Sequence, residues 1–160
     1  MTHQVYYSLL AREFEWELMP LGLDQNVGTL VWSPLSGAKL SGKVGRNKKP
    51  PADSRAATDA SWDAPEDRVF AVTDALDAIA VETGYSVPRL ALAWLLARPT
   101  ISSIVVGARN AEQLRDNLAA AEVALNGEHL ARLEEASVER PIYPYWHQRR
   151  TSSDRNPPPV

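Results

Sequence analysis

The sequence predicts an α/β fold with parallel strands, and three observations lead to this fold class. Short runs rich in β-branched and aromatic residues alternate with longer segments in which apolar residues recur at helical spacing. The predicted order is strand, helix, strand, long loop, two helices, strand and two helices, which is typical of parallel β/α units with right-handed crossovers. The strand-like runs are apolar, as expected for strands covered on both faces.

The first two elements follow each other closely near the start of the chain. Residues 4–10 are rich in strand-forming residues. Residues 13–23 alternate Glu with large apolar residues, which indicates a short helix weakened by Pro20 and Gly22.

A second strand and a long loop come next. Thr29–Ser33 is predicted to be a buried strand, and Pro34 ends it. Residues 36–62 then change in composition to Gly, Ser, Lys, Asn, Pro and Asp. Long loops inside compact domains are usually functional or mobile, so we expect this segment to carry part of a site.

Two helices are predicted after the loop. The first begins near Asp63, with Glu66 at the capping-box position, and Gly84 ends it. Ser86 caps the second helix, Val87–Arg98. The apolar face of the first helix consists of Val69, Val72, Leu76 and Ile79.

The stretch Ile101–Asn117 is predicted to contain a buried strand, a tight turn and a helix start. Ile104–Val106 is a β-branched run suited to a strand covered on both faces, and Gly107 allows the chain to turn. Asn110 can cap the next helix, with Gln113 completing a capping box. The apolar face of that helix is predicted to be Leu114, Leu118 and Ala121.

This helix start is a candidate phosphate site. A helix N-terminus carries free N–H groups and a partial positive charge. Arg109 lies at its mouth, and Gln113 and Asn117 stack on one face of the first turns. The alternative is an ordinary connection between a strand and a helix.

The main domain is predicted to comprise residues 1–139. Its last element is predicted to be a helix from about Gly127 to Val138. The tail, residues 140–160, is rich in Pro, Tyr and Arg, and we expect it to cover the surface or to be disordered. Three strands alone would leave apolar edges exposed. The sequence therefore resembles part of a larger β/α assembly.

The composition excludes several classes of site. The chain has 160 residues, a net charge of −3 and an isoelectric point of about 5.6, which does not favour a nucleic-acid or membrane partner. It contains no cysteine, which excludes disulfides, thiolate catalysis and cysteine-bound metals. His3, His129 and His147 do not have the spacing of metal ligands. We expect a cytoplasmic protein without a metal.

The segment Gly37–Lys43 fits the pattern G-x-x-x-x-G-K, the phosphate loop of nucleotide hydrolases. Val44 stands where that loop needs Ser or Thr to hold Mg²⁺, and a run with Gly and Pro follows instead of a helix. The hydrolase interpretation therefore lacks its structural context.

Four motifs, taken together, connect the chain to a known family. They are Gln4-Val-Tyr-Tyr-Ser8 with Arg12, Trp32-Ser-Pro-Leu-Ser-Gly37 with Leu40-Ser-Gly-Lys43, Ala91-Leu-Ala-Trp-Leu95, and Gly107-Ala-Arg-Asn-Ala-Glu-Gln-Leu-Arg-Asp-Asn117. In order and spacing, over residues 4–137, they resemble the C-terminal half of an aldo/keto reductase. The tail segment Pro141–Trp146 also resembles the C-terminal extension of that family.

The resemblance implies a partial (β/α)₈ TIM barrel, in which this chain supplies parallel strands six to eight with their helices. It also implies an NADP(H) cofactor, with residues 36–62 as a cofactor loop. In such barrels active sites lie at the C-terminal ends of the strands. Gln4 would bind the nicotinamide carboxamide, and Trp32 would stack on the nicotinamide ring.

The remaining cofactor residues implied by the resemblance serve its phosphates and adenosine. Ser33, Pro34, Leu35 and Gly37 would line the pyrophosphate path, and Gly107 lies at a strand end. Lys43 would close over the phosphates, and Arg55 would reach the adenosine phosphate. Arg109 would pair with the 2′-phosphate, since a guanidinium can bind phosphate through two nitrogens, and Gln113 and Asn117 would hold the adenine.

The family's catalytic Asp, Tyr, Lys and His precede the first of these motifs, so no catalytic residue is assigned to this chain. We expect an NADP-dependent oxidoreductase half that is inactive alone and that supports hydride transfer to a small aldehyde or ketone in a complete barrel. Its partner would be the missing N-terminal half, or a second copy meeting it through the open strand edges. The alternative is a non-catalytic nucleotide-binding or dimerising half-barrel module.

Overall fold

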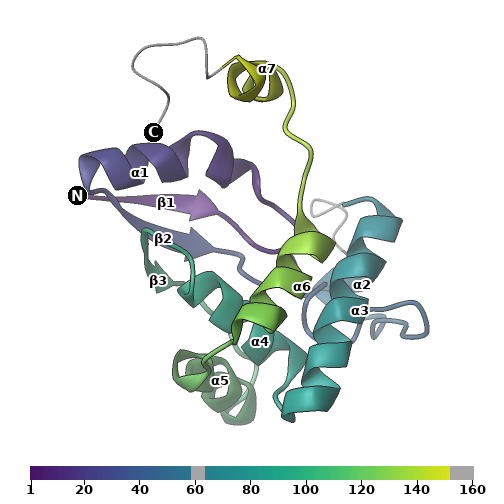
Figure 1. Cartoon of the computed structure of the whole chain (residues 1–160). Helices are drawn as coiled ribbons and strands as arrows, with labels where there is room; N and C mark the ends of the chain where they lie inside the picture. The colour runs from purple at the N-terminus through teal and green to yellow at the C-terminus, as the bar shows by residue number, and fades with distance from the viewer. Residues whose placement is uncertain (59–63, 152–160) are drawn as a thin grey trace.

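A three-stranded parallel sheet forms the centre of the computed structural model, which describes residues 1–58 and 64–151 (Figure 1). Its strands are β1 (Thr2–Tyr6), β2 (Gly28–Trp32) and β3 (Ile101–Ile104), in the order β1-β2-β3. The β1 and β2 registers are continuous, whereas β2 and β3 shift register between Thr29 and Leu30. The prediction of parallel strands is confirmed. Because the strands run in one direction, their C-terminal ends meet at the same edge of the sheet.

Helices occupy the connections between and after the strands. They are η1 (Glu13–Trp16), α1 (Leu18–Gln25), α2 (Arg55–Thr58), α3 (Glu66–Thr83), α4 (Val87–Leu96), α5 (Ala111–Leu118), η3 (Ala119–Glu122), α6 (Gly127–Ser137) and α7 (Tyr145–Arg150). The helix α4 packs against β3, η3 and α5, and α3 and α6 lie side by side (Figure 1). Within the described residues, no helix has the length and apolar character needed to cross a lipid bilayer.

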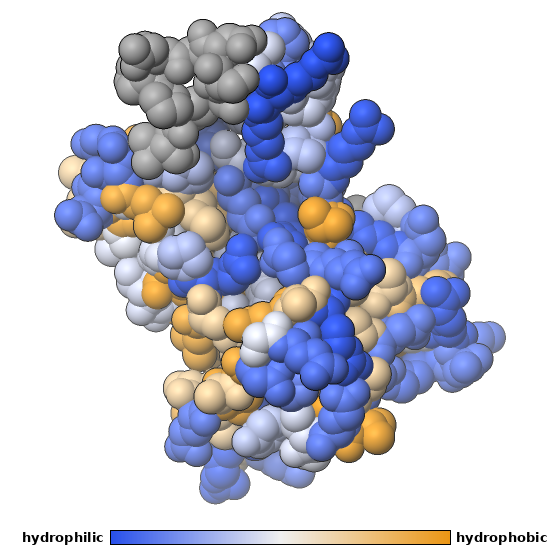
Figure 2. Space-filling model, viewed as in Figure 1, coloured by the Kyte–Doolittle hydropathy of each residue, from blue (hydrophilic) through white to orange (hydrophobic). Residues whose placement is uncertain are grey.

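The two faces of the sheet differ, which corrects the expectation that the strands are covered on both faces. Val5 and Val31 are buried against the helices, whereas Gln4 and Trp32 on the other face are exposed. The difference follows from the alternation of side chains along a strand together with packing on one face. Figure 2 shows mostly hydrophilic residues on the visible surface, with small hydrophobic patches, one of them over α1.

Several predicted boundaries move when the chain folds. β1 ends at Tyr6, because Ser8 and Ala11 exchange backbone hydrogen bonds of 3.1 Å and turn the chain. β3 ends at Ile104, and Val105 is 48% exposed beyond it. The strand predicted over Ile104–Val106 is therefore wrong in both extent and burial.

The observed helix starts and buried faces also differ in part from those predicted from the sequence. α3 begins at Glu66, so this residue is not at a capping-box position, and Asp63 lies outside the described residues. Gly84 ends α3 in the left-handed conformation, and the Ser86 side chain accepts from the Arg89 N–H, as predicted. Leu114 and Leu118 share a face as predicted but are 42% and 61% exposed, so that face is not buried.

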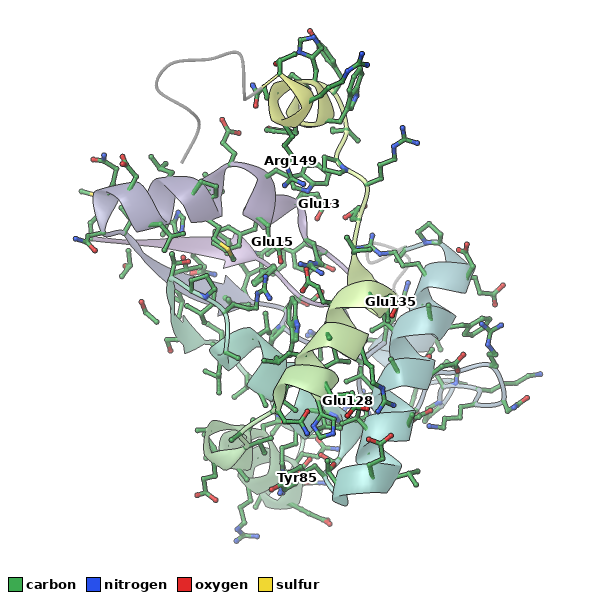
Figure 3. The ribbon with its side chains drawn as sticks, in the orientation of Figure 1. Glu13, Glu15, Tyr85, Glu128, Glu135 and Arg149 are labelled. Atoms are coloured by element: carbon green, nitrogen blue, oxygen red, sulfur yellow. The ribbon has the colours of Figure 1, made fainter. Side chains whose placement is uncertain are left out.

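The tail contains a helix that the composition did not indicate. The Tyr145 hydroxyl of α7 donates to Glu17 at 3.0 Å, and the Tyr145 ring lies 5.4 Å from that of Trp16. Figure 3 shows Arg149 of α7 above the segment that carries Glu13. The described part of the tail thus covers η1 and the start of α1, while residues 152–160 lie outside the described residues.

The core is centred on Trp94 and Tyr7, whose side chains are fully buried with ring centroids 5.5 Å apart. It continues into the helices through Leu76, Ile79, Leu90, Leu95 and Leu133, none of which is measurably exposed. This packing joins β1, α3, α4 and α6 into one unit.

A buried charge cluster adjoins this core. Arg12 is 3% exposed, donates to Glu15 at 2.6 and 2.9 Å and to Glu134 at 2.6 Å, and its guanidinium lies 5.3 Å from the Trp94 ring. Burial lowers the pKa of Arg12, but the hydrogen bonds and charges of the two carboxylates outweigh burial and raise the pKa above its ordinary value. Arg12 therefore stays charged inside the protein.

Ionisation of Tyr7 should lower the stability of the fold as the pH rises through the alkaline range. Burial raises the pKa of Tyr7 above its ordinary value of 10.0, and the Glu15 carboxylate, 2.5 Å from the Tyr7 hydroxyl, raises it further. Above pH 10 the unfolded chain releases this proton while the folded chain keeps it. We therefore expect the free energy of unfolding to fall by about 1.4 kcal/mol per pH unit from this group.

Urea unfolding at a series of pH values from neutral to alkaline measures how the free energy of unfolding depends on pH. Tyr7→Phe removes the group and should flatten the alkaline slope by that amount. Tyr143→Phe, at a side chain that is 70% exposed, serves as the matched control and should leave the slope unchanged. Equal slopes in the unmodified chain and Tyr7→Phe would contradict the expectation.

Candidate functional site

The segment after β2 has an unusual backbone. Ser33, Ser36 and Ala38 have φ angles of 50°, 48° and 74°, and Gly37 between them has a φ of 60°. Residues other than glycine rarely occupy this left-handed region, and where they do so the backbone is strained. Such strain concentrates at binding and catalytic sites, which marks this segment as a candidate.

Buried contacts hold the strained segment in place. The Ser36 hydroxyl is buried and lies 2.6 Å from the Ser8 hydroxyl. Leu40 is fully buried, and its N–H donates to the Leu35 carbonyl at 3.2 Å. The backbone of this segment is therefore positioned by the core rather than by solvent.

The N-terminus of α5 is organised by side-chain caps. The Asn110 side chain accepts from the Gln113 N–H at 2.9 Å, as predicted. The Gln113 side chain in turn accepts from the Arg109 N–H at 3.0 Å, one residue earlier than in a standard capping box. Asn117 is buried, and its amide donates to the Gly107 carbonyl at 3.4 Å. These bonds fix the turn from β3 into α5.

Ion pairing attaches α5 to α4. Arg89 of α4 donates to the Asp116 carboxylate at 3.0 and 2.7 Å, and Ser86 hydrogen-bonds to the same carboxylate. The position of α5 relative to the sheet edge is thereby set through α4, which packs on β3.

A groove with a volume of about 930 Å³ lies at the C-terminal edge of the sheet, between the strained segment after β2 and the start of α5. The segment after β2, residues 50–56 and the turn from β3 into α5 form its walls. The predicted cofactor residues that line it are Trp32, Ser33, Pro34, Leu35, Gly37, Lys43, Arg55, Gly107, Arg109, Gln113 and Asn117. Gln4 is exposed on β1 and is not among the lining residues.

The charged side chains of the groove are unevenly distributed. Lys43, Arg55 and Arg109 are cationic, and Asp53 is the acidic residue among the groove's lining residues, all of which the structure describes. Arg109 lies 3.6 Å from the Asp53 carboxylate and donates to the Asp53 main-chain carbonyl at 3.4 Å. The groove is therefore suited to an anionic ligand.

The loop that carries Lys43 is attached to α3 on its outer side. Arg46 pairs with Asp74 at 2.8 Å, and Lys48 pairs with Asp77 at 2.6 Å. Residues 44–54, which directly follow Lys43, form no helix, in agreement with the argument against a hydrolase phosphate loop. Within residues 1–58 and 64–151, no cluster of His, Asp and Glu is arranged to hold a metal ion.

Comparison with known proteins identifies the family of this chain. A sequence model of the aldo/keto reductase family matches residues 1–138. The chain belongs to the aldo/keto reductase family. The resemblance found in the four motifs is thus confirmed, and several of the matching relatives are named as oxidoreductases or reductases.

Two curated relatives show how much of an aldo/keto reductase is present. An uncharacterized oxidoreductase, YrpG, of Bacillus subtilis is 37% identical over 135 residues, which cover 84% of this chain and 40% of YrpG. An NADH-specific methylglyoxal reductase of Escherichia coli is 33% identical over 125 residues, covering 77% of this chain and 37% of that protein. The chain spans about two fifths of the length of these relatives.

The fold comparison agrees with the family. The solved structure of a thermostable aldo-keto reductase, Tm1743, in complex with the inhibitor epalrestat superposes with a TM-score of 0.59. The match covers 84% of this chain and 39% of that chain at 24% sequence identity. It shows an α/β fold with parallel strands like that of an aldo-keto reductase.

The groove also contains residues that the sequence did not assign to a site. Pro88 enters from the start of α4, and Val105 and Val106 follow β3. Pro50, Pro51 and Asp53 come from the long loop. The composition of the loop marked it as functional, but no local signal distinguished Asp53 from its other polar residues.

The side-chain cap that Asn110 forms at the start of α5 can be tested by mutation. Asn110→Ala removes the acceptor for the Gln113 N–H, so we expect the free energy of unfolding to fall by about 1 kcal/mol. Urea denaturation measures the change. Asn47→Ala, in an exposed turn, is the control and should change stability by less than about 0.5 kcal/mol. A loss no larger than that of the control would contradict the assigned cap.

Proposed function

We propose that this chain is the NADP(H)-binding half of an aldo/keto reductase, corresponding to strands six to eight of a (β/α)₈ barrel. In the complete protein it would support hydride transfer to a small aldehyde or ketone. The observation that carries the proposal is the groove, which brings the segment after β2 together with the start of α5. These segments are far apart in the sequence, and both carry motifs of the family.

The side chains present fit a dinucleotide with an additional phosphate. Trp32 is 36% exposed at the end of β2, and its ring offers a flat apolar surface for a nicotinamide. Arg109, Lys43 and Arg55 supply positive charge, and α5 directs its N-terminus toward the same groove. When bound, NADPH would supply the hydride, while this chain would bind and orient it.

Proton delivery is not provided by this groove. Its lining contains no Tyr or His, and Asp53, its acidic residue, is ion-paired with Arg109. General acid catalysis needs a positioned proton donor. We therefore assign that step to the Asp, Tyr, Lys and His that the family places before the first motif, outside this chain.

Cofactor choice is tested by titration of the chain with NADPH and NADH, followed by nicotinamide fluorescence. The Escherichia coli relative is named as NADH-specific, so both cofactors are compared. We expect preference for NADPH, and a loss of about 10- to 100-fold in NADPH affinity on Arg109→Ala, because charged hydrogen bonds to the 2′-phosphate are removed.

Arg115→Ala is the matched control for this titration. Arg115 lies on the same helix but is not among the groove residues, so its removal should leave NADPH affinity nearly unchanged. Equal losses for the two arginines would indicate a general charge effect. Binding of neither cofactor, together with self-association in sedimentation, would favour the dimerising form of the half-barrel module, whose exposed edges would be the outer sides of β1 and β3. Binding of both without turnover after addition of the N-terminal half would favour its non-catalytic nucleotide-binding form.

Activity gives an independent test. The purified chain with NADPH and a panel of small aldehydes and ketones should show no turnover above background, since we assign the proton donor to residues outside this chain. Addition of a segment carrying the family's N-terminal half should restore it. Turnover by the chain alone would contradict the assignment of catalysis to residues outside it.

A further inference from the structure

Asp53 is the one groove residue whose charge opposes the ligand proposed above. Its carboxylate lies 3.6 Å from the Arg109 guanidinium, and its main-chain carbonyl accepts from the same guanidinium at 3.4 Å. Two nitrogens of Arg109 are thereby directed to a single residue of the long loop. The contact joins segments 56 positions apart across the groove.

We propose that Asp53 is a specificity-determining residue that competes with a phosphate for Arg109. The inference rests on the proposed function of the groove. A phosphate monoester carries nearly two negative charges at neutral pH and can accept from both sides of a guanidinium. A ribose hydroxyl carries no charge and cannot displace a carboxylate. Asp53 thus sets the affinity for the 2′-phosphate without affecting a cofactor that lacks it.

The exposure of the pair makes such an exchange feasible. The Arg109 side chain is 66% exposed and that of Asp53 is 80% exposed. Ion pairs in contact with water are weak, because solvent screens both charges. A dianion can therefore take the place of the carboxylate, which swings into solvent without a buried charge being left behind.

The surroundings give Arg109 no other acidic contact among the groove's lining residues. Lys43 and Arg55 are cationic, and the Arg109 N–H is already held by the Gln113 side chain at 3.0 Å. The backbone of Arg109 is therefore positioned independently of Asp53. Removal of the Asp53 charge should free the guanidinium without displacing the residue that carries it.

The experiment compares adenosine 2′,5′-bisphosphate with adenosine 5′-monophosphate as probes in isothermal titration. Asp53→Asn preserves size and hydrogen bonding but removes the charge, and we expect about two- to five-fold tighter binding of the bisphosphate. Binding of the monophosphate should not change. The gain should disappear when Arg109→Ala is combined with Asp53→Asn, and should shrink between about 0.01 M and about 1 M ionic strength.

Asp24→Asn makes the same change in net charge on α1, away from the groove, and should leave the affinity for both probes unchanged. Weaker bisphosphate binding in Asp53→Asn would show that Asp53 orients Arg109, and would overturn the competition. Unchanged bisphosphate binding would overturn it as well, with the proposed function intact. If neither probe binds the unmodified chain or any variant, the proposed function and the inference both fail.

Discussion

The rest of the structure depends on the hydrogen bonds and ion pairs that the buried guanidinium of Arg12 makes. This guanidinium lies beyond β1, contacts Glu15 of η1 and Glu134 of α6, and donates to Ser137, 125 positions later, at 3.0 Å. Because buried ion pairs lose hydration, such a cluster adds little net stability over an apolar replacement. Loss of one partner, however, leaves charges buried and unpaired. Arg12 therefore connects the segment after β1 with η1 and α6.

This connection positions the groove through the core. The guanidinium groups of Arg12 and Arg98 lie 5.3 and 5.0 Å from the centroid of the Trp94 ring. Trp94 belongs to α4, the helix that holds α5 through the pair of Arg89 and Asp116. The end of the groove at the start of α5 is thus connected to the charge cluster through α4. The strained segment after β2 is attached separately, through Ser36 and Leu40.

The lining of the groove supports the proposal that this chain carries the cofactor-binding part of an aldo/keto reductase. The residues that this chain contributes are cationic, flat or backbone groups, which suit recognition of a dinucleotide. Asp53 adds a negative charge beside Arg109, and in the competition proposed above a phosphate displaces it. We therefore propose that cofactor binding and discrimination reside in this half, and that the proton donor comes from a part of the barrel outside it.

The sequence by itself determined the order of the elements, the parallel sheet, the caps at Ser86 and Asn110, and the family. These features depend on residues a few positions apart, or on motifs of fixed spacing, so local chemistry specifies them. Placement of most predicted cofactor residues along one groove agrees with the motifs, whereas their binding of NADP(H) remains a prediction.

Only the tertiary structure decided which surfaces are covered and which distant residues meet. The exposure of Val105 and Leu114, the position of Gln4 outside the groove, and the contact of Asp53 with Arg109 had no local signal. Burial depends on what packs against each face, and long-range ion pairs depend on sheet register and helix position. Neither the burial of a side chain nor a long-range ion pair can be predicted from the periodicity of a single segment. Both are set only when the whole chain is folded.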